Sequence, residues 1–190
     1  YKLSDGWAFR LDTYLQSARP GSKVVNLAVP GYSTYQALPT GTNNPTGKPT
    51  VDSTHNVTMA LATHPDAIIV AFPSQGEIES GAITVNQVML NLHTIANAAN
   101  SAGVEIWIAT SQPRTTTAAT VNMLLNLNSR IVADFATHSL DFWTPLADVQ
   151  TGLPLPQYIN NYDGIHFNDK GHSLMFETVQ AADIPTAVGK

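Results

Sequence analysis

Apolar residues follow two spacings along the chain, one typical of helices and the other of buried strands. A period of about 3.6 residues predicts helices over 7–18, 84–102 and 117–135, and a further helix capped by Asn168 or Asp169. Short runs that are apolar on both faces predict strands at 23–29, 66–72, 104–110 and 139–143. Because strands alternate with helices and no hairpin signal joins the strands, we expect an α/β fold with a parallel sheet covered on both faces.

Shorter local signals lie between the first two strands. A short helix over 34–38 is predicted, capped by Thr34. Another is predicted to start at Asn56 and to run to Thr63. An Asn-Val-Thr glycosylation motif also begins at Asn56, and it matters only in a host that glycosylates. Residues 39–52 are dense in Thr, Gly, Asn and Pro and predict a loop, whose length indicates that it is either functional or poorly ordered.

The composition limits the classes of protein to be considered. A chain of 190 residues with 43% hydrophobic residues is expected to fold as a single domain over 1–190. Only 12% of residues are charged, so Thr, Asn and Ser supply the polar surface, and we expect a secreted or extracytoplasmic protein. The net charge is −5 and the basic residues are scattered, which excludes nucleic acid as a partner.

Three features that the sequence lacks also bear on the class of protein. There is no cysteine, which excludes disulfides and thiolate metal sites. No apolar run approaches the ~20 residues of a membrane-spanning helix. The chain also begins without a charged and apolar leader, so we expect that a leader was either never there or has been removed.

A stretch near the C-terminus carries candidate catalytic chemistry. Asp163 and His166 are three residues apart on a turn that opens the last predicted helix. This spacing lets the carboxylate of Asp163 orient the imidazole of His166. In a hydrolase, such a histidine takes a proton from a nucleophile and returns it to the leaving group, while the carboxylate fixes the tautomer and stabilises the imidazolium.

Other polar groups follow the predicted strands. In an open parallel sheet, the loops that leave the carboxyl ends of the strands share one edge, where ligands bind. These loops supply a backbone N–H at a glycine, a primary amide, a guanidinium and the imidazole, which are most of the groups of an acyl-transfer site. The loops are 30–33, 72–76, 110–114, 143–145 and 163–166.

The order of these blocks resembles that of the SGNH or GDSL-type hydrolases, three-layer α/β/α, flavodoxin-like esterases and carbohydrate deacetylases. The late block of that family matches Asp163 and His166, and its glycine block matches residues 26–34. The resemblance implies that the N–H of Gly31 lines an oxyanion hole. The family's third block supplies an Asn after the central strand, and here the aligned residue is Gln75, one methylene longer.

The nucleophile block of the family has no clear counterpart. The family's serine lies in a Gly-Asp-Ser turn after the first strand, upstream of a helix like 7–18. Ser4 precedes Asp5 and Gly6, but no apolar strand comes before it, so Ser4 or Asp5 is interpreted as the cap of that helix. Ser33 and Ser74 belong to the other two blocks. We therefore expect a chain that lacks the family's first strand and nucleophile turn, with an upstream segment, another chain or a rearranged sheet filling the internal strand position.

These residues support two classes of function, and they give less support to a third. The leading hypothesis is a serine-type hydrolase acting on a small ester or an acylated carbohydrate, with no cofactor. The alternative is a non-catalytic carbohydrate-binding module on the same fold, with a cleft lined by Tyr32, Tyr35, Trp143 and Tyr158. Only the hydrolase requires a serine within hydrogen-bond reach of His166. Metal-dependent hydrolysis by Asp163, His166 and His172 is disfavoured because His172 lies inside the helix and no second acidic cluster is evident.

Overall fold

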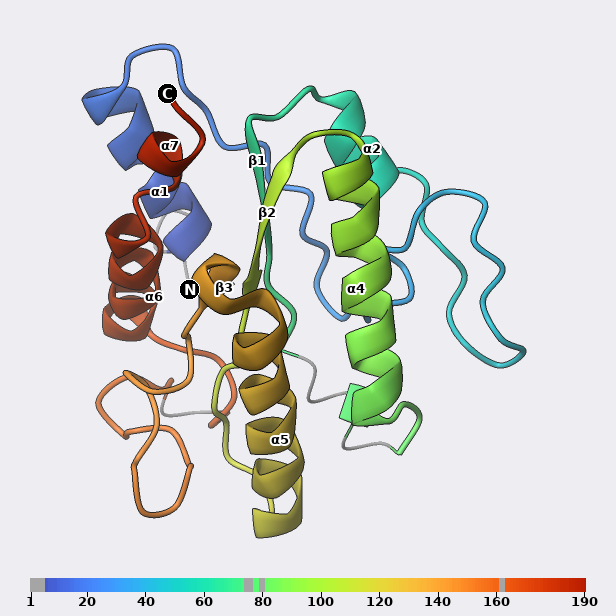
Figure 1. Ribbon diagram of the computed structural model, residues 1–190. Helices are drawn as coiled ribbons and strands as arrows, with labels where there is room; N and C mark the ends of the chain where they lie inside the picture. Colours follow the sequence, from blue (N-terminus) through green and yellow to red (C-terminus); the bar gives the residue numbers. More distant parts are fainter. Residues whose placement is uncertain (1–5, 74–76, 79–80, 161–162) are drawn as a thin grey trace. The chain divides into compact units, whose positions relative to one another are not determined.

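Residues 6–73, 77–78, 81–160 and 163–190 are described by the computed structural model (Figure 1). Contacts between Cα atoms divide them into two units. The first comprises the described residues of Tyr1–Asn26, Gln112–Val121 and Leu140–Lys190, and the second those of Leu27–Ser111 and Asn122–Ser139. The single domain over 1–190 stays a prediction.

The second unit contains the parallel strands. β1 (Ala67–Val70) and β2 (Glu105–Ala109) pair in parallel, with Ala67 opposite Glu105. The strand order is β1-β2-β3, with the two-residue β3 (Ser139–Leu140) beside β2. α4 (Val85–Ser101) packs on β2, and α2 (Val57–Ala62) packs on α4 (Figure 1). The predicted parallel sheet with flanking helices is confirmed.

α4 shows why the long helices could be predicted. Thr84 and Gln87 form a capping box, in which each side chain bonds the backbone N–H of the other. Gly103, with a φ of +72°, follows the C-cap, where a left-handed residue ends a helix at little cost. The buried residues of α4 repeat at helical spacing and face the core: Val88, Met89, Asn91, Leu92, Ile95, Ala96 and Ala99.

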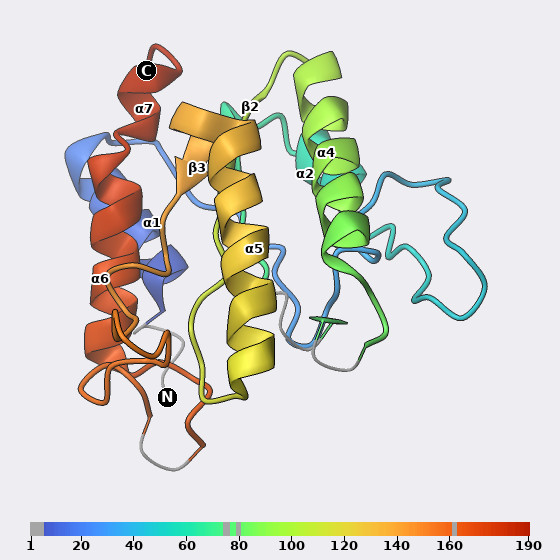
Figure 2. The ribbon, with the colours of Figure 1, turned by 60° about the horizontal axis from the view of Figure 1, so that its bottom comes forward.

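The first unit is built around two helices near the ends of the chain. α1 (Trp7–Ala18) packs on α6 (Asp169–Ala181), as both views show (Figures 1 and 2). The rings of Tyr14 and Phe176 meet edge to face at 5.9 Å between centroids, and Arg10 pairs with Asp169. α7 (Ile184–Ala187) follows α6.

α5 (Ala118–Phe135) connects the segment after β2 with β3, through the 3-10 helix Ala136–His138. Its predicted range of 117–135 is confirmed, and Leu124, Leu127 and Ile131 form its buried stripe. None of the helices in the described part of the chain is long and apolar enough to cross a bilayer.

The strand predicted at 23–29 is wrong. The segment has no strand conformation, and Val25 is 45% exposed. A strand depends on a neighbour that pairs with its N–H and C=O groups. Here the N–H of Val24 donates instead to the Oδ1 of Asp12, at 2.6 Å. The apolar run is thus an extended segment that begins on a side-chain contact with α1.

Two local predictions also need correction. Residues 34–37 form a turn and no helix. The N-cap of α1 is Gly6, and Ser4 and Asp5, the predicted caps, lie outside the described residues. The last strand ends at Leu140 instead of running to 143, because the carboxylate of Asp141 accepts the N–H groups of Trp143 and Thr144 and so closes a turn.

The helix predicted to start at Asn56 is α2, and Asn56 is its N-cap. Its Oδ1 accepts from the N–H of Met59 at 2.9 Å. Its Nδ2 is buried and donates to the carbonyl of Leu38 and the hydroxyl of Thr40. The amide of the glycosylation motif is therefore already engaged in the folded protein.

Gly171 in the first turn of α6 offers a test of this packing. A Cβ at this position would lie 2.7 Å from both the carbonyl oxygen of Tyr158 and the Cδ1 of Phe167. Because one of these atoms belongs to the backbone and cannot swing away as the end of a side chain can, Gly171→Ala is expected to lower the free energy of unfolding by about 1–3 kcal/mol. Urea unfolding measures the change. The exposed Gln180→Ala on the same helix is the control, and equal stability of the two variants would contradict the packing.

Candidate active site

The structure contains the predicted hydrogen bond between Asp163 and His166. The Oδ2 of Asp163 lies 2.8 Å from the Nδ1 of His166. The Oδ1 of the same carboxylate accepts the N–H groups of Ile165 and His166, at 2.8 and 2.9 Å. One carboxylate therefore shapes the backbone of the turn and holds the imidazole that the turn carries.

These contacts also set the charge of the Asp163 carboxyl. The N–H of His166, then that of Ile165 and then the imidazole, lower the pKa of the Asp163 carboxyl to about 2. Asp163 is thus ionised at neutral pH and fixes a proton on Nδ1. The side chain of His166 is 74% exposed, and no partner bonds its Nε2 within the described segments. Nε2 is therefore left to act as a base.

Backbone bonds on both sides hold this turn. The N–H of Asn160 donates to the carbonyl of His166 at 2.7 Å, and the N–H of Thr115 donates to the carbonyl of Gly164 at 3.0 Å. Gly164 has a φ of +65°, and a Cβ there would lie 3.0 Å from the hydroxyl of Thr115. Both observations explain the glycine between Asp163 and His166.

Asn168 joins the turn to α6. Its Oδ1 accepts the N–H groups of Lys170 and Gly171, so it is the N-cap of the helix as predicted. Its Nδ2 donates to the carbonyls of Gln157 and Ile159. The buried Phe167 lies between Asn168 and His166 in sequence. The imidazole is therefore two residues from a helix end that is fixed on both sides.

In the second unit, Gly31 lies at a tight turn. The N–H of Tyr32 donates to the carbonyl of Val29 at 3.3 Å, and Pro30 and Gly31 occupy the two central positions, with a φ of +79° at Gly31. That pattern is typical of a type II turn, which favours glycine. Gly31 is exposed, and its N–H has no acceptor in the part of the chain that the structure describes. The N–H is available to a ligand.

Buried polar groups fix the residues that follow this turn. Thr34 donates to the Oε1 of Glu77 from its N–H and its hydroxyl, at 2.8 and 3.0 Å. The Nδ2 of Asn91 donates to the same hydroxyl at 2.9 Å. Burial raises the pKa of the Glu77 carboxyl. Neither Glu77 nor Asn91 was predicted from the sequence. Only the position of Glu77, two residues after Gln75, could have indicated its role.

The remaining predicted residues divide into three groups. Gln75, Ser74 and Ser4 lie outside the described residues. The hydroxyl of Ser33 donates to the Oε1 of Gln36 within its own turn. His172 lies in α6, and the described segments contain no cluster of three His, Cys, Asp or Glu side chains that could hold a metal.

The aromatic cleft proposed for a binding module needs correction. Tyr35 and Trp143 are buried in the core, at 4% and 7% exposure. Side chains that are covered by the protein offer no face to a sugar. Tyr32 and Tyr158 are half-buried. Of the four rings, these two keep a surface that a ligand could reach.

Comparisons with known proteins place these observations in a family context. The model of the family described as GDSL-like Lipase/Acylhydrolase matches residues 3–179. A search of curated proteins found no match. Among solved structures, the psychrotrophic esterase EstA from Pseudoalteromonas sp., inhibited by monoethylphosphonate, has a TM-score of 0.68 at 14% identity, over 98% of this chain and 90% of that one.

Two further structures are similar. TesA has a TM-score of 0.67 at 17% identity, over 97% of this chain and 91% of its own. A GDSL-like lipase from Bacteroides thetaiotaomicron has a TM-score of 0.57 at 18% identity, over 67% of this chain, and the match spans 65% of the length of that lipase. At these identities the likeness shows the fold, which is a parallel sheet with flanking helices.

The titration of Glu77 gives a test of the second unit. Its pKa lies above the ordinary 4.5, so the folded protein binds this proton more tightly than the unfolded chain does. Its contribution to stability is full below the unfolded pKa and is lost as pH rises through the folded pKa. Glu77→Gln keeps an acceptor for Thr34 and removes the titration. The variant should therefore gain stability relative to the parent between about pH 4 and pH 7.

Urea unfolding at both pH values measures this change. The exposed Glu177→Gln is the control, and its difference from the parent should show no such gain. A difference between Glu77→Gln and the parent that does not change with pH would contradict a raised pKa at Glu77.

Proposed function

The chain belongs to the family of GDSL-like lipases and acylhydrolases, and from this we propose that it is a serine-type hydrolase of ester bonds. The observation that carries the proposal is the Asp163–His166 pair, with Nδ1 held at 2.8 Å and Nε2 exposed. An imidazole fixed in this way is the general base that activates a serine hydroxyl.

The proposed reaction has two steps, acylation of the serine and hydrolysis of the acyl-enzyme, and His166 transfers a proton in each. The Nε2 of His166 takes the proton of a serine hydroxyl while the oxygen attacks the acyl carbon of the ester. The resulting imidazolium is stabilised by the ionised Asp163 and gives its proton to the leaving alcohol. Water, deprotonated in the same way, then releases the acid and restores the serine. The nucleophilic serine is not among the residues assigned from the structure.

The developing oxyanion needs hydrogen-bond donors. We assign this role to the N–H of Gly31, supported by its exposed position at a turn and by the absence of an acceptor among the described residues. Gln75 is the proposed second donor, on the family resemblance alone. One such donor typically contributes ~10²–10³ in rate.

The proposal also includes the class of substrate, which is a small ester or an acylated carbohydrate. The similar proteins are described as a lipase and an esterase, which supports a small ester. An acylated carbohydrate fits the same chemistry, because removing an acyl group from a sugar hydroxyl is also ester hydrolysis. A secreted or extracytoplasmic location stays a proposal that rests on the low content of charged residues.

Two substitutions test the roles of the pair. His166→Ala should lower kcat on 4-nitrophenyl acetate by ~10⁶-fold, because no other base replaces the imidazole. Asp163→Asn should cost less, ~10⁴-fold, because the geometry survives the loss of charge. His93→Ala is the matched control, since His93 also bonds a carboxylate, Asp134, at 2.8 Å, and it should keep the parent rate.

Labelling identifies the nucleophile in the same experiment. A fluorophosphonate should modify one serine of the parent, located by peptide mapping, and should react far more slowly with His166→Ala. A parent protein with no label and no hydrolysis, but with affinity for carbohydrate, would contradict a hydrolase and support the binding module.

A further inference from the structure

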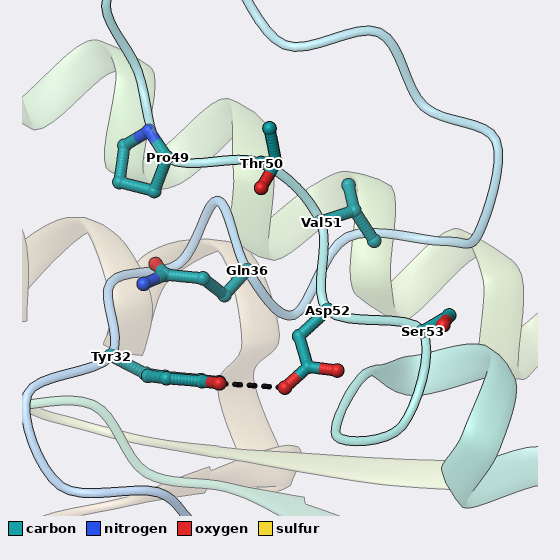
Figure 3. Close-up of a pocket in the computed structure, with 7 residues that line it drawn as sticks. All are labelled: Tyr32, Gln36, Pro49, Thr50, Val51, Asp52 and Ser53. Atoms are coloured by element: carbon teal, nitrogen blue, oxygen red, sulfur yellow. Dashed lines mark hydrogen bonds between the residues drawn. The ribbon is translucent and has the colours of Figure 1, made fainter.

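A hollow in the surface of the second unit lies directly after the Gly31 turn. This hollow, of about 470 Å³, opens beside Tyr32 and Gln36, and the segment 49–53 forms its other wall (Figure 3). Its volume is within the range of small-molecule sites. All the lining residues belong to the second unit: Tyr32, Gln36, Pro49, Thr50, Val51, Asp52 and Ser53.

The two walls of this hollow are bonded to each other. The N–H of Asp52 donates to the carbonyl of Gln36 at 3.0 Å. The hydroxyl of Tyr32 donates to the Oδ2 of Asp52 at 2.6 Å, the contact drawn in Figure 3. The Nδ2 of Asn44 also donates to the carbonyls of Tyr35 and Pro49. The site is therefore formed before any ligand arrives, which lowers the entropic cost of binding.

Asp52 is fully occupied by the protein itself. Its Oδ1 accepts the N–H and the hydroxyl of Thr54, at 2.8 and 2.6 Å. Its Oδ2 accepts from Tyr32 and pairs with the Nδ1 of His55 at 2.9 Å. Four contacts from three residues satisfy the lone pairs that a carboxylate offers. Asp52 therefore orients the ring of Tyr32 and offers little to a cationic ligand.

The groups left for a ligand are neutral. The Oε1 of Gln36 accepts the N–H and the hydroxyl of Ser33, while its Nε2 has no acceptor within the described ranges. The hydroxyls of Thr50 and Ser53 are exposed and have no bond to the described part of the protein. The ring of Tyr32 and the side chain of Val51 add apolar faces.

This set of groups selects among ligand classes. An anion would need a cation, and the lining residues include no lysine or arginine. An acyl chain would need a mainly apolar wall, whereas five of the seven lining side chains are polar. Hydroxyl and amide groups beside an aromatic ring suit a neutral polyhydroxylated ring, which hydrogen-bonds at its edge and packs its C–H face on the aromatic side chain.

We propose that this pocket is a binding subsite for a neutral sugar unit of the substrate. The proposal rests on the proposed function, because Tyr32 follows Gly31 directly and a sugar held here would place its ester group next to the proposed oxyanion donor. Tyr32 and Gln36 are the specificity-determining residues, and Asp52 is a positioning residue that acts through Tyr32.

Binding of xylotriose, a neutral and unacylated sugar, tests the pocket without requiring turnover. Titration up to ~10 mM should shift the amide NMR signals of Tyr32, Gln36 and 50–53. Tyr32→Ala and Gln36→Ala should each weaken binding about tenfold, as expected for losing one ring face or one hydrogen bond. Thr46→Ala, on the same loop but outside the pocket, is the matched control and should bind as the parent does.

Charged and apolar probes separate the ligand classes. Trigalacturonate and hexanoate should leave the pocket signals unchanged, and binding of either one there in place of xylotriose would overturn the proposal. Absence of xylotriose shifts, or equal affinity in the Tyr32→Ala and Gln36→Ala variants, would also overturn it. NMR spectra of each variant show that it is folded.

Hydrolysis is scored separately from binding. A protein that cleaves 4-nitrophenyl acetate but does not bind xylotriose would overturn the subsite and leave the hydrolase. A protein that binds xylotriose in this pocket without cleaving any ester would support the subsite and overturn the proposed catalysis.

Discussion

The carboxylate of Asp163 is the constraint on which the candidate site depends. Its three accepted hydrogen bonds fold residues 163–166 into a turn and hold the imidazole of His166 at the end of that turn. Without the side chain of Asp163, the two backbone N–H groups and the Nδ1 proton would lose a common acceptor. The low pKa of this carboxyl, about 2, records the same contacts. The conformation of this turn and the orientation of its imidazole therefore have the same cause.

Two other carboxylates hold the Gly31 segment, and their environments are opposite. The hydroxyl of Thr54, followed by that of Tyr32, keeps the pKa of the Asp52 carboxyl well below its usual range, so Asp52 is a surface anion surrounded by donors. Glu77 is largely desolvated, and burial raises its pKa. Each is bonded to a residue shortly after Gly31, Asp52 to Tyr32 and Glu77 to Thr34. Loop segments without regular structure are thus fixed by side-chain acceptors.

The sequence predicted what depends on local signals and missed what depends on distant contacts. The capping box and apolar stripe of α4 lie within one segment, as do Asp163 and His166, and both were found. The run 23–29 has the composition of a strand, but a strand requires a neighbour, and the N–H of Val24 is taken by Asp12. The support of Thr34 by Glu77 and Asn91 joins residues 43 and 57 positions apart. No spacing rule along the chain indicates such pairs, because they arise from tertiary packing.

The hydrogen bond to Asp163 fixes the tautomer and the orientation of His166. Nitrogen and proton NMR of the neutral form of the imidazole measures this directly, without a substrate. We expect a proton on Nδ1, protected from exchange by its bond to Asp163, and no proton on Nε2; Asp163→Ala should abolish the protection. A neutral His166 that carries its proton on Nε2, or exchange at Nδ1 that is the same in the parent and in Asp163→Ala, would contradict this role of Asp163.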